Sequence, residues 1–222
     1  MVQRVTQVLV TTALQGAVLF GFAGRLDWAW GWGYIAVYLL MILANALILT
    51  RINPDVIAKR ADTAGVRGWD TLVGGVFALA YFIGLPLIAG LDARGGWTEV
   101  PLWVHWTGAG VFLAGSGLFV WAMAVNAHFA TVMRIDNREG GHQVAMSGPY
   151  RIVRHPGYLG ALFQSVATPL ILGSLWALIP AGVALVALLF RTVLEDRTLQ
   201  AELPGYDQLV QQTPYRLIPG VW

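Results

Sequence analysis

The stretch LWVHWTGAGVFLAGSGLFVWAMAVNA, from Leu102 to Ala127, decides the fold class of this chain. It contains no Asp, Glu, Lys or Arg, and it exceeds the roughly 20 residues that a helix needs to cross a bilayer core of about 30 Å. Three similar runs precede it, from Val5 to Gly24, from Trp28 to Thr50 and from Thr71 to Leu91. We therefore predict four transmembrane helices within residues 1–125.

The composition of the whole chain supports a membrane environment. Of the 222 residues, 57% are hydrophobic and only 12% are charged, whereas a soluble domain carries about a quarter of charged residues. The net charge is +2 and no polybasic stripe is present, which argues against a nucleic-acid partner. The absence of cysteine excludes disulfides, a thiolate nucleophile and Cys-ligated metals.

A further apolar stretch follows from Gly157 to Phe190, interrupted by Pro169 and by Gly173-Ser174. Ser174 can cap a new helix there. We expect a hairpin of two short helices, roughly 16 residues each, that either spans the bilayer or partly re-enters it. The prediction is an all-α, polytopic integral membrane bundle of about six transmembrane helices, with residues 126–222 integrated into the same domain.

The distribution of cations predicts the orientation of the bundle. Twelve of the fourteen Lys and Arg residues fall on the side of the termini and the two long loops, Arg51–Asp70 and His128–Arg154, while the other side holds only Arg25 and Arg94. The positive-inside rule then places both termini in the cytoplasm. We expect an integral membrane protein, in the inner membrane if the source is bacterial.

The predicted cytoplasmic loop contains the segment HQVAMSGPYRIVRHPGYLG, from His142 to Gly160. Gly and Pro disfavour helix there, so the loop presents free backbone N–H and C=O groups that can clasp a polar ligand. Two simpler interpretations stay open. The loop can be a solvated connection whose Arg residues only set topology, and His155-Pro156 can be an ordinary helix start.

A second polar group lies where the last helix is expected to leave the membrane. Arg191 and Glu195 are four residues apart, hence on one helix face, and Asp196 follows. Ionisable residues at membrane depth usually face a polar cavity or a partner. The alternative is an intrahelical ion pair with Arg191 snorkelling to the interface. Folding of the hairpin would bring both polar segments together at one end of the bundle.

These segments resemble a known family. Gly-Pro-Tyr-x-x-x-Arg-His-Pro-x-Tyr-x-Gly, here Gly148–Gly160, followed by Arg-x-x-x-Glu-Glu/Asp-x-x-Leu, here Arg191–Leu199, resembles the isoprenylcysteine carboxyl methyltransferases. That family belongs to a wider group of membrane methyltransferases that includes phospholipid N-methyltransferases and methanethiol S-methyltransferase. The tail Leu203–Pro219 is similar to the family's C-terminal signature, with two departures: Asp196 replaces a Glu, and Leu209 replaces a second tail tyrosine.

The resemblance implies that S-adenosylmethionine binds in a cytoplasmic pocket closed by the C-terminal segment, with a lipophilic methyl acceptor arriving laterally from the bilayer lipids. It assigns catalytic roles to Arg191 and Glu195, and Arg191 would contact the acceptor. The cofactor-binding positions implied by the motif are His142, Gln143, Val144, Ala145, Tyr150, His155, Pro156, Gly157, Tyr158 and Glu195.

The residue chemistry agrees with methyl transfer from a sulfonium. Such a displacement needs orientation and a dry site rather than a protein nucleophile or a metal, and we predict no metal site. Arg191 can hold an acceptor carboxylate, which is ionised and needs no base, so carboxylate O-methylation is favoured. An amine or thiol acceptor, as in phospholipid or thiol methyltransferases, would have to lose a proton to Glu195, Asp196 or His155.

Two other classes of function stay open at this level. Membrane sterol reductases are similar in this C-terminal region and bind NADPH. A non-enzymatic assembly factor or channel component would use the polar cluster for structure alone.

Overall fold

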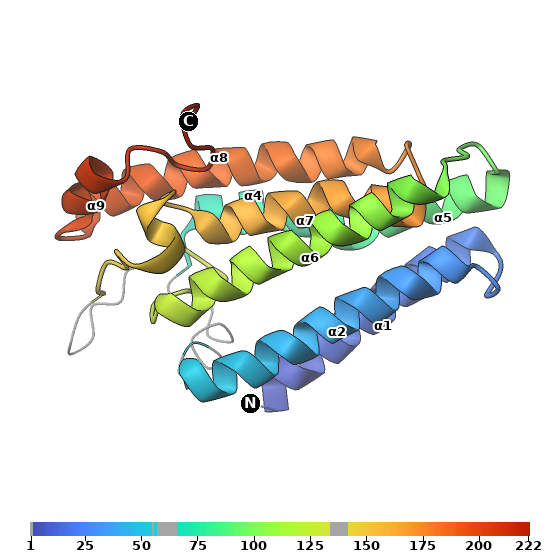
Figure 1. Ribbon diagram of the computed structural model, residues 1–222, viewed down its shortest axis with the longest axis horizontal. Helices are drawn as coiled ribbons and strands as arrows, with labels where there is room; N and C mark the ends of the chain where they lie inside the picture. Colours follow the sequence, from blue (N-terminus) through green and yellow to red (C-terminus); the bar gives the residue numbers. More distant parts are fainter. Residues whose placement is uncertain (1, 55, 57–65, 134–141) are drawn as a thin grey trace.

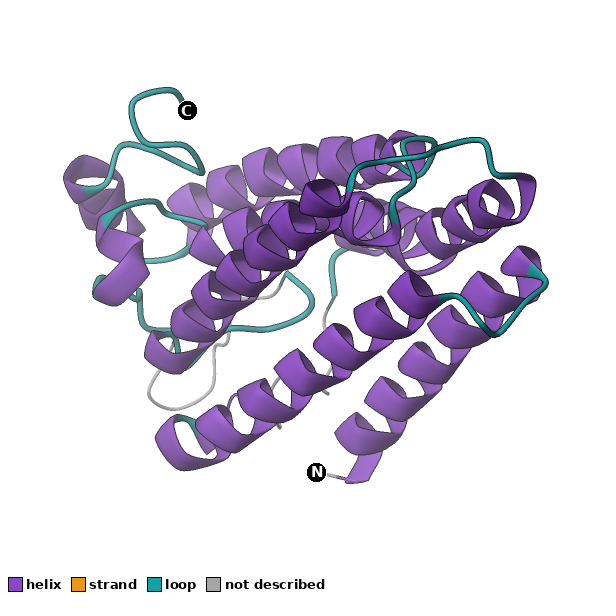
Figure 2. Cartoon of the chain, turned by 45° about the vertical axis from the view of Figure 1, so that its right-hand side comes forward, coloured by secondary structure: helices purple, strands orange, loops and turns teal. Residues whose placement is uncertain are grey.

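A computed structural model describes residues 2–54, 56, 66–133 and 142–222 of the chain, and within them the regular structure is entirely helical (Figure 2). The long helices run along one common direction (Figure 1). The all-α membrane bundle predicted from the sequence is confirmed. The elements are α1 (Val2–Ala23), α2 (Ala29–Ile52), α4 (Gly68–Leu79), the π-helical turn η1 (Ala80–Gly84), α5 (Leu85–Gly95), α6 (Leu102–Val125), the 3₁₀ turn η2 (Gly148–Arg151), α7 (Pro156–Leu172), α8 (Leu178–Glu202) and α9 (Tyr206–Gln212).

Four of these helical segments are long and apolar enough to cross a membrane: α2, the continuous α4–η1–α5 segment, α6 and α8. In α1 the corresponding apolar part is shorter, Val8–Ala23. The π-helical turn η1 interrupts the continuous α4–η1–α5 segment just before Pro86, which lies in the first turn of α5. Proline removes one backbone donor and crowds the preceding turn, which explains the local widening.

The C-terminal hairpin forms as predicted, but its two helices differ in length. α7 has 17 residues and ends at Gly173, whose positive φ of 71° gives a left-handed cap. Ser174 Oγ accepts a hydrogen bond from the Ala177 amide at 3.1 Å and donates one to Asp92 Oδ2 at 2.5 Å. The expectation of about 16 residues for the second helix is wrong. α8 has 25 residues because it continues past Phe190 into charged sequence.

Glycines let the backbones of α6 and α7 approach closely. A Cβ on Gly115 would lie 2.7 Å from the carbonyl oxygen of Gly160, and one on Gly160 would lie 2.6 Å from that of Gly115. Further along, a Cβ on Gly108 would lie 2.7 Å from the Ile171 amide nitrogen. Small residues at helix interfaces permit such packing in membranes. This seam fixes the position of α7 and the motif loop that precedes it.

The α1–α2 pair lies beside the layer formed by α6, α7 and α8, with α4 behind that layer (Figure 1). Buried apolar side chains join the groups, with Leu19 from α1, Tyr34 from α2, Leu85 from α5, Phe112 from α6 and Ile171 from α7 in one cluster. Large apolar side chains also cover the outside, for example Phe190 at 62% exposed. An apolar exterior of this kind suits a lipid environment.

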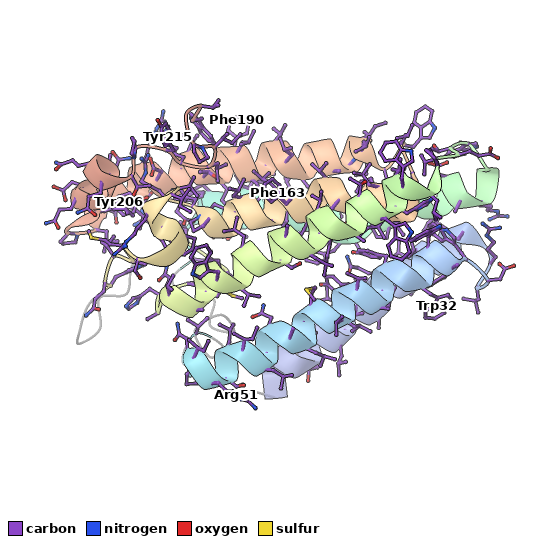
Figure 3. The ribbon with its side chains drawn as sticks, in the orientation of Figure 1. Trp32, Arg51, Phe163, Phe190, Tyr206 and Tyr215 are labelled. Atoms are coloured by element: carbon purple, nitrogen blue, oxygen red, sulfur yellow. The ribbon has the colours of Figure 1, made fainter. Side chains whose placement is uncertain are left out.

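The two ends of the bundle differ in side-chain chemistry. Arg51, Tyr206 and Tyr215 lie toward one end and Trp32 toward the other (Figure 3). The cytoplasmic assignment of the first end stays a prediction from the charge distribution. Four cations on which it depends, Lys59, Arg60, Arg134 and Arg138, lie outside the described residues.

Candidate functional site

The cation-rich end of the bundle encloses a cavity of about 1130 Å³. Its walls come from α1, α2, α4, the loops before α7, α7 itself, α8 and α9. All but one of the cofactor-binding positions expected from the motif line it, and so does Arg191; the exception is Pro156, which is the first residue of α7 and is buried. The lining positions are His142, Gln143, Val144, Ala145, Tyr150, His155, Gly157, Tyr158 and Glu195.

The motif loop reaches the cavity because its glycines permit close contacts. Gly148 has a φ of 57°, and a Cβ there would lie 2.9 Å from the indole nitrogen of Trp121. A Cβ on Gly157 would lie 2.5 Å from the Phe129 ring. Tyr150, between them, is buried, and its hydroxyl accepts a hydrogen bond from Asn126 Nδ2 at 3.0 Å. Burial raises the pKa of Tyr150 despite this donor, so the phenol stays neutral.

The C-terminal tail lies directly against the motif loop. The Arg154 amide donates to the Tyr215 carbonyl at 2.9 Å, and the His155 amide donates to the Arg216 carbonyl at 3.0 Å. Tyr206 and Leu209 of α9 contribute to the cavity wall. Leu209, which stands where the family has a tyrosine, is buried in an apolar cluster. The tail therefore lies where the resemblance implied a closing segment.

Asp196 is the fully buried centre of a polar cluster. Its side chain is 0% exposed, and it accepts hydrogen bonds from Arg154 (Nε 2.9 Å, Nη2 3.1 Å), His155 (Nε2 3.2 Å) and Tyr206 (Oη 2.9 Å). Arg216 Nε and Gln200 Nε2 add donors at 2.8 Å each. We call these six residues the Asp196 cluster. Asp196 does not line the cavity, so its expected role as a candidate base for an acceptor proton does not fit this geometry.

The pKa values of the surrounding groups reflect this burial. Burial alone would lower the pKa of Arg154, but its hydrogen bonds and charge interaction with Asp196 raise it overall. Burial raises the pKa of Tyr206, and the negative charge of Asp196 raises it further. Arg154 therefore stays charged and Tyr206 stays a hydrogen-bond donor at neutral pH. His155 caps the start of α7 without a side-chain capping bond, because its ring turns to Asp196.

Glu195, the preceding residue, faces the cavity instead. Its side chain is 19% exposed, and its Oε1 lies 3.8 Å from His155 Nδ1. The Tyr158 hydroxyl donates to Glu195 Oε2 at 2.5 Å. The guanidinium of Arg191 stacks over the Tyr158 ring, 5.4 Å from its centroid. We call Glu195, Tyr158, Arg191 and Asp70 the Glu195 cluster.

Arg191 is not paired with Glu195, as an intrahelical ion pair would require. Its guanidinium faces Asp70 of α4, with Nε 2.7 Å from Oδ1 and Nη2 3.1 Å from Oδ2. Nη2 also donates to the Thr131 carbonyl at 2.7 Å. Asp70 Oδ2 accepts a second hydrogen bond, from the Met133 amide at 2.6 Å. Asp70 was not among the expected site residues, although a carboxylate at the start of an apolar span is a signal that could have identified it.

Among the residues that the structure describes, no group of three or more His, Asp and Glu side chains is arranged to hold a metal ion.

A comparison with known families identifies the segment that carries most of this site. Residues 103–203 match the phospholipid methyltransferase family. This match confirms the resemblance of this segment to the membrane methyltransferases. No curated protein matches the chain. The matched segment contains α7, the whole of α8 and both motifs, whereas Asp70, Tyr206 and most of the tail lie outside it.

Proposed function

We propose that the protein is an integral membrane methyltransferase that transfers the methyl group of S-adenosylmethionine to a lipophilic acceptor. The observation that carries the proposal is one cavity that joins the expected cofactor residues of the motif loop and α8 to apolar residues of α1 and α4. With about 1130 Å³, the cavity exceeds the usual upper size of a single small-molecule site, about 1,000 Å³. It can therefore hold a cofactor together with the reactive part of an acceptor.

The residues on the cavity wall fit the charges of this cofactor. S-adenosylmethionine carries a sulfonium, an ammonium, a carboxylate and ribose hydroxyls, and it supplies the activated methyl group. Glu195 faces the cavity with no arginine or lysine within ion-pair distance among the described residues, so it can accept hydrogen bonds from the ammonium or the ribose. Residues 142–145 and Tyr150 can form hydrogen bonds with the remaining polar groups of the cofactor.

The acceptor would occupy the part of the cavity lined by the transmembrane helices. Val8 and Leu14 of α1 and Phe77 of α4 give this part apolar walls, which suit a lipid-anchored molecule. In its finer form the proposal is carboxylate O-methylation of the isoprenylcysteine type, with Arg191 at the acceptor. A carboxylate needs no base, and the protein would supply orientation and exclusion of water.

A phospholipid amine or a thiol is the second candidate acceptor, favoured by the family match and by the position of Glu195. The acceptor N–H or S–H proton would pass to a Glu195 oxygen as the new N–C or S–C bond forms and the cofactor's S–CH₃ bond breaks. Glu195 can take this role because it faces the cavity, whereas Asp196 is sealed.

Cofactor titration tests the proposed activity. Purified protein in detergent should bind S-adenosylmethionine by calorimetry, and Glu195→Gln should weaken that binding about ten- to a hundredfold, the usual effect of losing a charged hydrogen-bond partner. Glu202→Gln is the matched control, because Glu202 lies on the same helix and points to Arg67 outside the cavity. Binding of NADPH without S-adenosylmethionine would refute the proposal in favour of a reductase.

The chemistry of the product identifies the acceptor class. Incubation with methyl-labelled cofactor and a membrane lipid extract should transfer label to the lipid fraction. Mild alkali releases label from a methyl ester as methanol but leaves N-methyl and S-methyl groups intact. Alkali-labile label supports carboxylate O-methylation, and alkali-stable label supports the amine or thiol acceptor.

A further inference from the structure

Asp70 connects three walls of the cavity through one carboxylate. It lies in the first turn of α4, is 2% exposed, and meets Arg191 of α8 and the Met133 amide of the loop after α6. An acidic residue is favourable in the first turn of a helix. The residue lies outside the segment that matches the family model, residues 103–203. Its contact with Arg191 depends on the packing of α4 against α8.

The contact between Asp70 and Arg191 matters because a second carboxylate, that of Glu195, lies one helical turn from Arg191. Arg191 and Glu195 are four residues apart on α8, the spacing at which opposite charges pair on a helix surface. They do not pair, because the guanidinium is turned toward Asp70 and lies over the Tyr158 ring. The Tyr158 hydroxyl occupies Glu195 Oε2 instead. A hydroxyl donor leaves the negative charge of Glu195 in place, whereas a guanidinium would neutralise it.

We propose that Asp70 is a positioning residue that keeps Arg191 away from Glu195 and so preserves the charge of Glu195 for a cationic cofactor. The inference rests on the proposed function, in which Glu195 contacts S-adenosylmethionine. Without the carboxylate of Asp70, Arg191 loses its counter-ion and turns to the nearest carboxylate on its own helix face, that of Glu195. The cofactor then has to displace an arginine to reach its partner.

Asp70→Asn is the sharpest variant for this proposal. It removes the charge but keeps an oxygen that can accept from the Met133 amide, so the loop contact at 2.6 Å has a replacement. The expected result is a cofactor affinity about ten- to a hundredfold weaker than in the unaltered protein, measured by calorimetry. A positioning role through Arg191 further predicts that the double variant Asp70→Asn/Arg191→Met regains most of this affinity, although it cannot hold the acceptor and stays inactive.

The double variant separates this role from a purely structural one. Loss of affinity in Asp70→Asn with recovery in the double variant supports the proposal. Affinity unchanged in Asp70→Asn, or loss without recovery, overturns it. If Asp70→Asn alone does not fold, the double variant still decides: binding within about threefold of the unaltered protein supports the proposal, and weaker binding contradicts it.

A failure of this inference is distinguishable from a failure of the proposed function. If the unaltered protein binds no S-adenosylmethionine, the proposed function fails. If the unaltered protein binds it and Asp70→Asn binds it equally well, only the role of Asp70 fails. The conservative variant Asp70→Glu gives a further measure, because it restores a carboxylate and should retain more affinity than Asp70→Asn.

Discussion

The Asp196 cluster and the Glu195 cluster start from adjacent residues of α8 but are built differently. Asp196 is fully buried and accepts hydrogen bonds from five side chains. Glu195 is partly exposed to the cavity; one side chain, the Tyr158 hydroxyl, donates a hydrogen bond to it, and His155 Nδ1 lies 3.8 Å from its Oε1. A buried carboxylate whose oxygens all accept hydrogen bonds from the protein holds structural elements together. A carboxylate with free acceptor sites can bind a ligand. The comparison gives Asp196 a structural role and leaves Glu195 as the carboxylate for which we propose cofactor binding.

Asp196→Ala should give the largest effect, because it would leave Arg154 buried without its counter-ion. Removing one partner of a buried pair costs about 3–5 kcal/mol. The tail should detach from the motif loop as well, since Arg154, Tyr206 and Arg216 all converge on this carboxylate. Thermal unfolding in detergent and limited proteolysis of the C-terminal segment would measure both consequences.

Glu195→Ala is the matched control for this prediction. It should leave the unfolding temperature within a few degrees of the unaltered protein while weakening cofactor binding. Equal destabilisation by both substitutions would contradict the division between the two clusters.

Two tyrosine substitutions should have smaller effects than Asp196→Ala, one mainly on stability and the other mainly on cofactor affinity. Tyr206→Phe removes one donor from Asp196, and Tyr158→Phe removes one donor from Glu195. We expect Tyr206→Phe to cost about 1 kcal/mol of stability with little change in cofactor affinity. Tyr158→Phe should mainly change the affinity, because it alters the environment of the cavity-facing carboxylate.

Calorimetric titration and thermal unfolding of both variants would check this pattern. Because burial, and then the charge of Asp196, raise the pKa of Tyr206, its hydroxyl should remain a donor at neutral and mildly alkaline pH. The effect of Tyr206→Phe should therefore be the same at pH 7 and pH 9. If the two variants affect stability and affinity in the same proportion, the clusters act as one unit.

The smallest effect is expected at the surface ion pair between Arg67 and Glu202. Both side chains are well exposed, at 36% and 44%. Exposed pairs contribute about 0–1 kcal/mol, so Arg67→Ala should lower the stability by less than about 1 kcal/mol. Thermal unfolding at low and high salt would detect it. A larger loss of stability would mean that the Arg67–Glu202 pair interacts with the charged side chains of the two clusters.

The sequence predicted most elements of the fold and ten of the residues that line the cavity, those of the motif loop, α7 and α8, but not the lining residues of the N-terminal helices. The apolar runs place the membrane helices because each run is long enough to span a bilayer, and the motif spacing identified Tyr158, Arg191 and Glu195. The expected length of about 16 residues for the last helix was too short because it counted the apolar part alone, although the spacing of Arg191 and Glu195 had already indicated helix beyond Phe190. Pro156 was expected at the cofactor but serves as the first residue of α7.

By itself the sequence determined the helical membrane fold and the concentration of polar groups at one end of the bundle, because both follow from local composition and periodicity. Only the tertiary structure decided which charges pair. Arg191 could pair with Glu195 one turn away, yet it meets Asp70, 121 residues distant in the chain. The partner of Arg191 depends on how α4 packs against α8. The packing of the motif loop and the tail against α8 buries Asp196 and leaves Glu195 as the carboxylate that faces the cavity.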